Sequence, residues 1–155
     1  MQHHETVNWA RLQHLRAAYL GGHQRLQRDY WNSAQCLTDY DRTLGARIGW
    51  KWQHFLELVR PYIDSTALST VADWGCGTGQ AVRAFINAFA TPALQTILLV
   101  DRSVAAMEFT ASRIVNHAQR VEKHNDYPCD TPSDLTLVSH VVNELDGAGR
   151  SSLRR

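Results

Sequence analysis

The period of the hydrophobic pattern changes before the middle of this chain. In the first part, apolar residues such as Leu37, Tyr40 and Leu44 recur at steps of three or four, which predicts helices. In the second part, short apolar runs alternate with amphipathic segments, as in parallel strands joined by right-handed crossovers. We therefore expect an N-terminal helical extension over 1–66 and an α/β domain over 67–155.

The extension has a helical pattern over 6–31 and again from Ser33, a candidate N-cap, to the residue before Pro61. Gly45 and Gly49 interrupt the second pattern, and each costs about 1 kcal/mol relative to Ala, so a bend is expected near them. The extension caps one edge of the sheet, covers a ligand site or binds substrate. The sequence does not choose between these roles.

The α/β part contains six predicted elements. They are strands 70–74, 95–100, 119–123 and 134–139, and helices 79–90 and 103–116. In a Rossmann-like order the first strand is central, with the second and third on one side and the fourth on the other. The ligand crevice then lies at the carboxyl ends of the first and fourth strands.

The clearest motif joins the first strand to the next helix. Asp73 stands two residues before Gly75, Gly77 and Gly79, which alternate with Cys76 and a threonine. Glycines allow positive φ and close approach of a ligand, and the amides that open the helix favour a negative group. The dinucleotide fingerprint G-x-G-x-x-G would place its third glycine one residue later, at a position that is glutamine here.

The pattern D-x-G-C-G-T-G resembles the first motif of the Rossmann-like S-adenosylmethionine-dependent methyltransferases. A buried strand over 95–100 then ends at Asp101, where an acid accepts hydrogen bonds from two ribose hydroxyls. The resemblance implies an α/β fold with a Rossmann-like methyltransferase core and S-adenosyl-L-methionine as its cofactor. Because only four strands are predicted where this fold has about seven, we expect an incomplete parallel sheet.

Two further stretches resemble the ribosomal small-subunit methyltransferase-like family, which includes mitochondrial small-subunit assembly factors. They are Ser-His-Val-Val-Asn-Glu-Leu over 139–145 and Ser-Ala-Gln-Cys-Leu-Thr-Asp-Tyr over 33–40. This resemblance implies methyl transfer at small-subunit ribosomal RNA, or a non-catalytic assembly factor that keeps the fold. Members often carry a cysteine cluster further along the chain. No such cluster precedes Arg155, so we expect a fragment that self-associates or pairs with another chain.

The resemblance also implies roles for residues near the cofactor. The loop Gly75, Cys76, Gly77 and Gly79 would lie under its methionine part, with Cys76 as a small packed side chain, and Asp73 would orient its amino group. The remaining candidates are Asp101 for ribose, Arg102 for the adenine face, and Asn125 and Asp126 for the adenine amino group. A surface turn is the alternative for the last two.

Ser139, His140 and Asn143 follow the fourth strand, where substrate would meet the transferable methyl group. His140 is a candidate base because its ordinary pKa is near 6.5, and Asn143 is the second catalytic candidate. The alternative is that both side chains bond backbone groups at a strand end. Methyl transfer from a sulfonium needs chiefly alignment, so a strong base is not required.

Composition narrows the class only slightly. The 155 residues carry 16 basic and 15 acidic side chains, so overall charge does not favour nucleic acid. Residues 1–60 have a modest basic excess, which is compatible with RNA phosphates, although a solvated helical surface is the favoured interpretation. The three cysteines are far apart and form no metal-ligand pair, which favours a reducing, cytoplasmic setting. No run approaches the length of a membrane helix.

Overall fold

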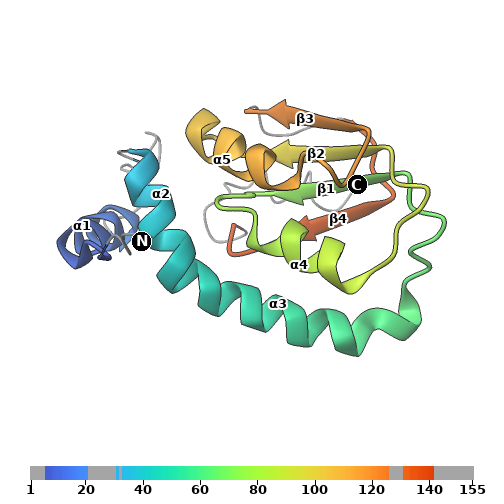
Figure 1. Cartoon of the computed structure of the whole chain (residues 1–155), viewed down its shortest axis with the longest axis horizontal. Coiled ribbons are helices and arrows are strands. Elements are labelled where there is room, and N and C mark those ends of the chain that lie inside the picture. Colours follow the sequence, from blue (N-terminus) through green and yellow to red (C-terminus); the bar gives the residue numbers. More distant parts are fainter. Residues whose placement is uncertain (1–5, 21–30, 32, 126–130, 142–155) are drawn as a thin grey trace, which may run out of the picture.

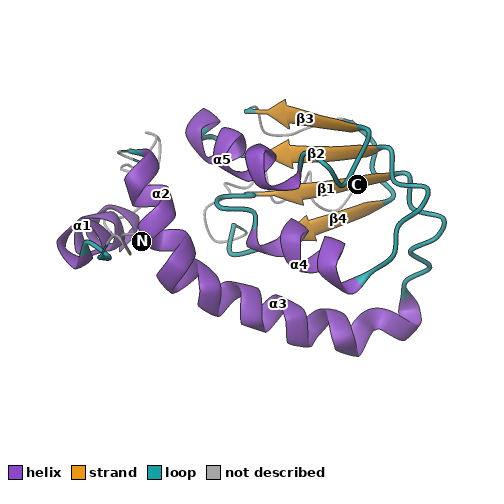
Figure 2. Cartoon of the chain, viewed as in Figure 1, coloured by secondary structure: helices purple, strands orange, loops and turns teal. Residues whose placement is uncertain are grey.

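The chain is described by a computed structural model over residues 6–20, 31, 33–125 and 131–141. Helices and strands separate into an extension and a sheet domain (Figures 1 and 2). The extension contains α1 (Trp9–Leu20), α2 (Ala34–Tyr40), a π-helical turn (Asp41–Gly45), α3 (Ala46–Val59) and a 3-10 turn (Arg60–Tyr62). The sheet domain contains β1 (Thr70–Trp74), α4 (Gln80–Ala88), β2 (Thr96–Val100), α5 (Val104–Ile114), β3 (Arg120–His124) and β4 (Leu135–Val138).

The four described strands form one parallel sheet in the order β3-β2-β1-β4. This is the topology expected from the sequence, with β1 central and the chain reversing direction across the sheet between β3 and β4. Asp73 of β1 pairs in register with Leu99 of β2 and Leu137 of β4. The loops after β1, β2 and β4 therefore meet at one edge of the sheet.

Helices α4 and α5 lie on the same face of the sheet (Figure 1). Both crossovers, from β1 to β2 and from β2 to β3, run in the same direction, so right-handed connections place both helices on that side. Val82 and Phe85 of α4 are fully buried against Val71, Ile97 and related side chains. Two such side chains each contribute about 1.5–3 kcal/mol when fully buried. This layer fixes the start of α4 relative to the end of β1.

The extension packs against the sheet domain at two places. Leu56 of α3 is buried in the same core as α4, and Figure 1 shows α3 running alongside that helix. Cys36 and Leu37 of α2 are buried with Ala106 of α5 in a second cluster. Figure 1 shows α1 and α2 beyond the carboxyl ends of the strands. Of the three expected roles for the extension, its position fits a cover over the ligand edge.

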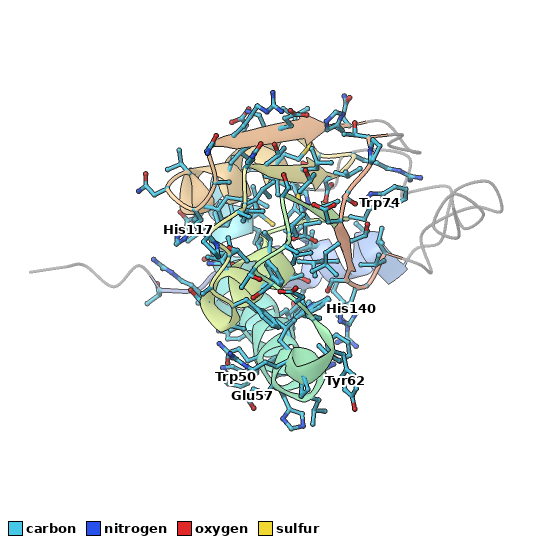
Figure 3. All side chains as sticks on the ribbon, turned by 90° about the vertical axis from the view of Figure 1, so that its right-hand side faces the viewer. Trp50, Glu57, Tyr62, Trp74, His117 and His140 are labelled. Atoms are coloured by element: carbon cyan, nitrogen blue, oxygen red, sulfur yellow. The ribbon has the colours of Figure 1, made fainter. Side chains whose placement is uncertain are left out.

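Some apolar positions of the sequence pattern are not in the core. Trp50 is 67% exposed and Phe55 is 50% exposed, although both are large apolar residues of α3. Val104 at the start of α5 and Val115 just after its end are exposed, while Met107 is buried. Figure 3 shows Trp50 on the outer side of the molecule, well away from Trp74. Periodicity located α3, α4 and α5, but their buried faces are narrower than the apolar pattern; of the helical pattern over 6–31, the described part forms α1, and 21–30 lie outside the described residues.

The helical pattern from Ser33 also contains an unexpected element. Ser33 caps α2 as predicted, since its hydroxyl accepts a hydrogen bond from the Cys36 amide. The expected bend is a π-helical turn that ends at Gly45, between two α-helical segments. Such turns often accompany functional sites. The domain boundary at residue 66 stays a prediction, because the extension and the sheet share a core.

Candidate functional site

The loop after β1 has the backbone conformation that its glycines allow. Gly75, Gly77 and Gly79 have φ values of 68°, 49° and 75°, in the left-handed region. The amides of Gly75 and Cys76 donate to the Val100 carbonyl at 2.7 and 3.2 Å. These two bonds tie the loop to the end of β2. Alternating glycines are thus required by the backbone, as predicted from the motif.

A Cβ added at each glycine would meet different surroundings. At Gly75 it would lie 2.7 Å from Cβ of Val141, which follows β4, and at Gly79 it would collide with the methyl group of Thr110 on α5. At Gly77 its nearest neighbour would be the Gly75 carbonyl oxygen at 3.9 Å. The loop is therefore packed on two sides and open at Gly77, where a ligand could approach the backbone.

Asp73 is fully buried at the start of this loop. Its Oδ2 accepts a hydrogen bond from the Val82 amide in the first turn of α4 at 3.2 Å. Within the described part of the chain, its Oδ1 is buried and has no hydrogen-bond partner. Burial raises the pKa of Asp73 to about 7, partly offset by the Val82 amide and reinforced by the charge of Asp101. An unpartnered buried carboxylate oxygen points to a missing cationic or donor group.

Asp101 lies directly beneath the loop, at the end of β2. Its Oδ2 accepts from the Gly77 amide at 2.8 Å, and its Oδ1 accepts from the Ser103 amide at 2.9 Å. Ser103 in turn caps α5 by accepting from the Ala106 amide. The structure therefore brings Asp101 and the glycine loop together as predicted. It also shows that this acid supports the loop itself.

The other cofactor candidates differ in their exposure to solvent. Arg102 and Asn125 are exposed at the carboxyl ends of β2 and β3, on the same edge of the sheet. Cys76 is buried, and burial is the main cause that raises the pKa of its thiol well above the ordinary value. This agrees with a packed side chain and excludes a ready thiolate nucleophile. Asp126 lies outside the described residues.

The end of β4 lies beside the end of β1, at the same edge of the sheet. The Ser139 hydroxyl accepts a hydrogen bond from the indole N–H of Trp52 on α3 at 2.9 Å. His140 is exposed and has φ 58°, the one described non-glycine residue with positive φ. Figure 3 labels His140 at the level between the sheet and α3. Asn143, the second catalytic candidate, lies outside the described residues.

Sequence reasoning missed the residues through which the extension contacts the loop. Asp41 in the π-helical turn accepts a hydrogen bond from Gln80 and forms an ion pair with Arg83, and both partners are on α4. Trp52 on α3, which was not among the candidates, donates to Ser139. One signal was available, because Gly45 and Gly49 are four residues apart on one helix face and permit close approach.

The comparisons with known proteins concern the fold. No family model matches the chain, and no curated protein matches it. Among solved structures, it is similar to the mitomycin 7-O-methyltransferase MmcR, with 19% identity and a TM-score of 0.58 over 94% of this chain and 44% of that one. It is also similar to a putative O-methyltransferase from Nostoc punctiforme PCC 73102, with 21% identity and a TM-score of 0.56 over 93% of this chain and 44% of that one.

The chain therefore has the fold of an S-adenosylmethionine-dependent methyltransferase, and it spans less than half the length of the two solved structures. This confirms the expected fold class. The finer resemblance to the ribosomal small-subunit family stays a prediction. In the described residues, no helix is long and apolar enough to cross a membrane, and no group of His, Cys, Asp and Glu is arranged to hold a metal ion.

Proposed function

We propose that the chain binds S-adenosyl-L-methionine at the carboxyl ends of β1 and β2 and forms the cofactor-binding part of a methyltransferase. One observation carries the proposal: the buried Oδ1 of Asp73, which has no hydrogen-bond partner among the described residues, lies at the start of a loop that is open at Gly77. The methionine part of this cofactor carries an ammonium group, and an ammonium is the kind of partner that a buried carboxylate needs.

The described residues are arranged so that they could contact the other parts of S-adenosyl-L-methionine as well. Gly77 leaves its backbone accessible, and Asp101 lies beneath it with a carboxylate able to accept from ribose hydroxyls. Arg102 and Asn125 border the same edge and remain the candidates for the adenine ring. When bound, the cofactor supplies an electrophilic methyl group on a sulfonium. The role of this chain is to hold that group and exclude alternative orientations.

For the acceptor, we propose a hydroxyl group of a small molecule that approaches from the end of β4. The two fold neighbours above are O-methyltransferases by name, which makes a hydroxyl the first acceptor to test. His140 is exposed at this edge and would receive the hydroxyl proton. Small-subunit RNA, expected from the sequence resemblance, is the second acceptor. The supporting feature for RNA is the modest basic excess of residues 1–60.

The direct test of cofactor binding is calorimetric titration with S-adenosylhomocysteine. We expect wild type to bind, and Asp101→Ala to lose most of its affinity because both the ribose acceptor and the partner of the Gly77 amide are removed. Glu108→Ala is the matched control, since Glu108 is an exposed acid on α5 paired only with Lys123. Equal affinity of the Asp101→Ala variant and wild type, or no binding by folded wild type, would contradict the proposal.

Transfer of a labelled methyl group separates the two acceptors. A panel of phenolic and other hydroxyl compounds is compared with small-subunit RNA, using wild type and His140→Ala. Label on a hydroxyl compound that decreases in His140→Ala supports the proposal. Label on RNA instead would support the ribosomal alternative. Salt-sensitive RNA binding without transfer would indicate a non-catalytic RNA-binding module.

A further inference from the structure

The first turn of α4 is attached to the N-terminal extension through a partly buried contact. Nε2 of Gln80 donates to Oδ1 of Asp41 at 2.7 Å, and the Arg83 guanidinium pairs with the same oxygen. The Asp41 side chain is only 14% exposed, so solvent screens this contact weakly. The residues come from opposite sides of the domain boundary, because Asp41 belongs to the π-helical turn and the other two to α4.

Two glycines of the extension make room for the Gln80 side chain. A Cβ added at Gly45 would lie 3.0 Å from Nε2 of Gln80, and one added at Gly49 would lie 2.5 Å from Oε1. Both glycines have helical backbone angles or lie within a helix, so neither is needed for its conformation. Each costs about 1 kcal/mol in helix propensity. Their use is therefore to accommodate the Gln80 amide.

The position of Gln80 connects this contact to the ligand loop. Gln80 is the first residue of α4, and the N-cap residue, Gly79, has no side chain with which to cap the helix. Two residues further along α4, the backbone amide of Val82 donates a hydrogen bond to Asp73. On the opposite side, the Thr110 hydroxyl donates to the Gly77 carbonyl at 3.0 Å. The loop is thus held from α5 on one side and from the extension on the other.

We infer that Gln80 and Asp41 are positioning residues, through which the N-terminal extension holds the glycine loop in its ligand-binding conformation. The inference rests on the proposed function, because the ligand is S-adenosylmethionine. It goes beyond it by making cofactor affinity depend on a contact that touches no cofactor atom. The extension is then a working part of the cofactor site as well as a cover at its edge.

A set of four variants tests this inference. Gln80→Ala removes the amide, Gly49→Ala pushes against it, and the double variant Gly49→Ala/Gln80→Ala removes both the amide and the collision. Gln53→Ala is the matched control, because Gln53 is an exposed glutamine on α3. Two quantities are measured in each: S-adenosylhomocysteine affinity by calorimetry, and amide hydrogen exchange in peptides that cover residues 76–83.

We expect Gln80→Ala and Gly49→Ala each to weaken affinity about tenfold, the cost of one lost buried hydrogen bond. The double variant should be no weaker than Gln80→Ala, because the added methyl group then meets no amide. Exchange over 76–83 should be faster in both single variants and unchanged in Gln53→Ala. Additive losses of affinity in the double variant would contradict the inference that Gly49 makes room for the Gln80 side chain.

The two proposals fail in different ways. If wild type does not bind the cofactor product, the proposed function is wrong, while the exchange measurement still decides whether Gln80 holds the loop. If wild type binds and Gln80→Ala matches it in both affinity and exchange, the inference is wrong and the proposed function stands. A lower melting temperature in Gln80→Ala with unchanged affinity would also overturn it, since that result indicates structural stabilisation alone.

Discussion

The loop after β1 and the end of β4, two parts of the candidate site, are built in different ways. On one side, the glycine loop is fixed by many short contacts: Gly75 and Cys76 donate to β2, Gly77 donates to Asp101, and Gly79 packs on α5. On the other side, the end of β4 has one described side-chain bond, from Trp52 to Ser139. His140 is exposed there with a left-handed backbone.

This difference matches the chemistry proposed for each side. A cofactor common to many enzymes needs a fixed cradle, and the glycine loop is fixed by hydrogen bonds with Val100, Asp101 and Thr110. An acceptor differs from enzyme to enzyme, so its side of the site is formed by exposed side chains at a strand end. The comparison teaches that the motif encodes the conformation of the loop locally, while the residues that hold it in place come from distant parts of the chain.

The largest expected effect concerns the pH dependence of stability without ligand. Asp73 has a folded-state pKa of about 7, against about 3.9 in an unfolded chain. The folded state therefore binds the extra proton between pH 4 and 7, and this contribution to stability is lost as pH rises through 7. At about 1.4 kcal/mol per pKa unit, the loss approaches about 4 kcal/mol.

Asp73→Asn removes this titration while its amide oxygen still accepts from Val82. Urea unfolding of both proteins should give similar stabilities near pH 4 and a more stable variant at pH 8. The quantity to compare is the difference in unfolding free energy between the two proteins at each pH, because contributions from all other groups are common to both. A difference that does not change with pH would show that Asp73 is ionised in the folded state.

The next effect compares two glycines of the same loop. Gly79→Ala should lower stability by about 3 kcal/mol, since positive φ and collision with Thr110 both oppose the methyl group. Gly77→Ala meets only backbone strain, so a loss of about 1 kcal/mol is expected. Gly77→Ala should nevertheless weaken binding of S-adenosylhomocysteine. Stability is measured by unfolding and affinity by calorimetry on both variants. Wild-type affinity in Gly77→Ala would contradict the placement of the cofactor at Gly77.

The smallest effect is expected at the end of β4. Trp52→Phe removes the indole donor to Ser139 and should cost about 1 kcal/mol of unfolding free energy. Ser139→Ala should cost a similar amount, and the double variant little more than either. Cofactor affinity should stay at the wild-type value throughout. A drop in affinity in Trp52→Phe would mean that the glycine loop and the end of β4 are not independent.

Much of the sheet domain could be predicted because its signals are local. The run Thr70–Trp74 followed by glycines, and the apolar spacing of Val82 and Phe85, define strand, loop and helix within one stretch of chain. The predicted strand order is confirmed for the same reason, since the alternation of elements and the handedness of crossovers leave few options. The position of Asp101 beneath the loop follows from that order.

The contacts of the extension could not be predicted in the same way. Asp41 and Gln80 are 39 residues apart, and nothing in the spacing of either shows that they meet. The exposed Trp50 and the buried Leu56 lie on one helix, and only the location of α4 decides which face is covered. The Asp73 pKa likewise depends on burial by several elements, which periodicity does not measure.

The π-helical turn Asp41–Gly45 has a consequence for the register of the chain. A π-helical turn contains one residue more than the α-helix it interrupts, and each α-helical residue turns the chain by about 100°. Deleting a single residue within it would restore a continuous helix and rotate α2 about that axis by roughly 100°. Cys36 and Leu37 would then turn away from Ala106. Sequences that share this architecture should therefore tolerate substitution in the turn far better than a one-residue change in its length.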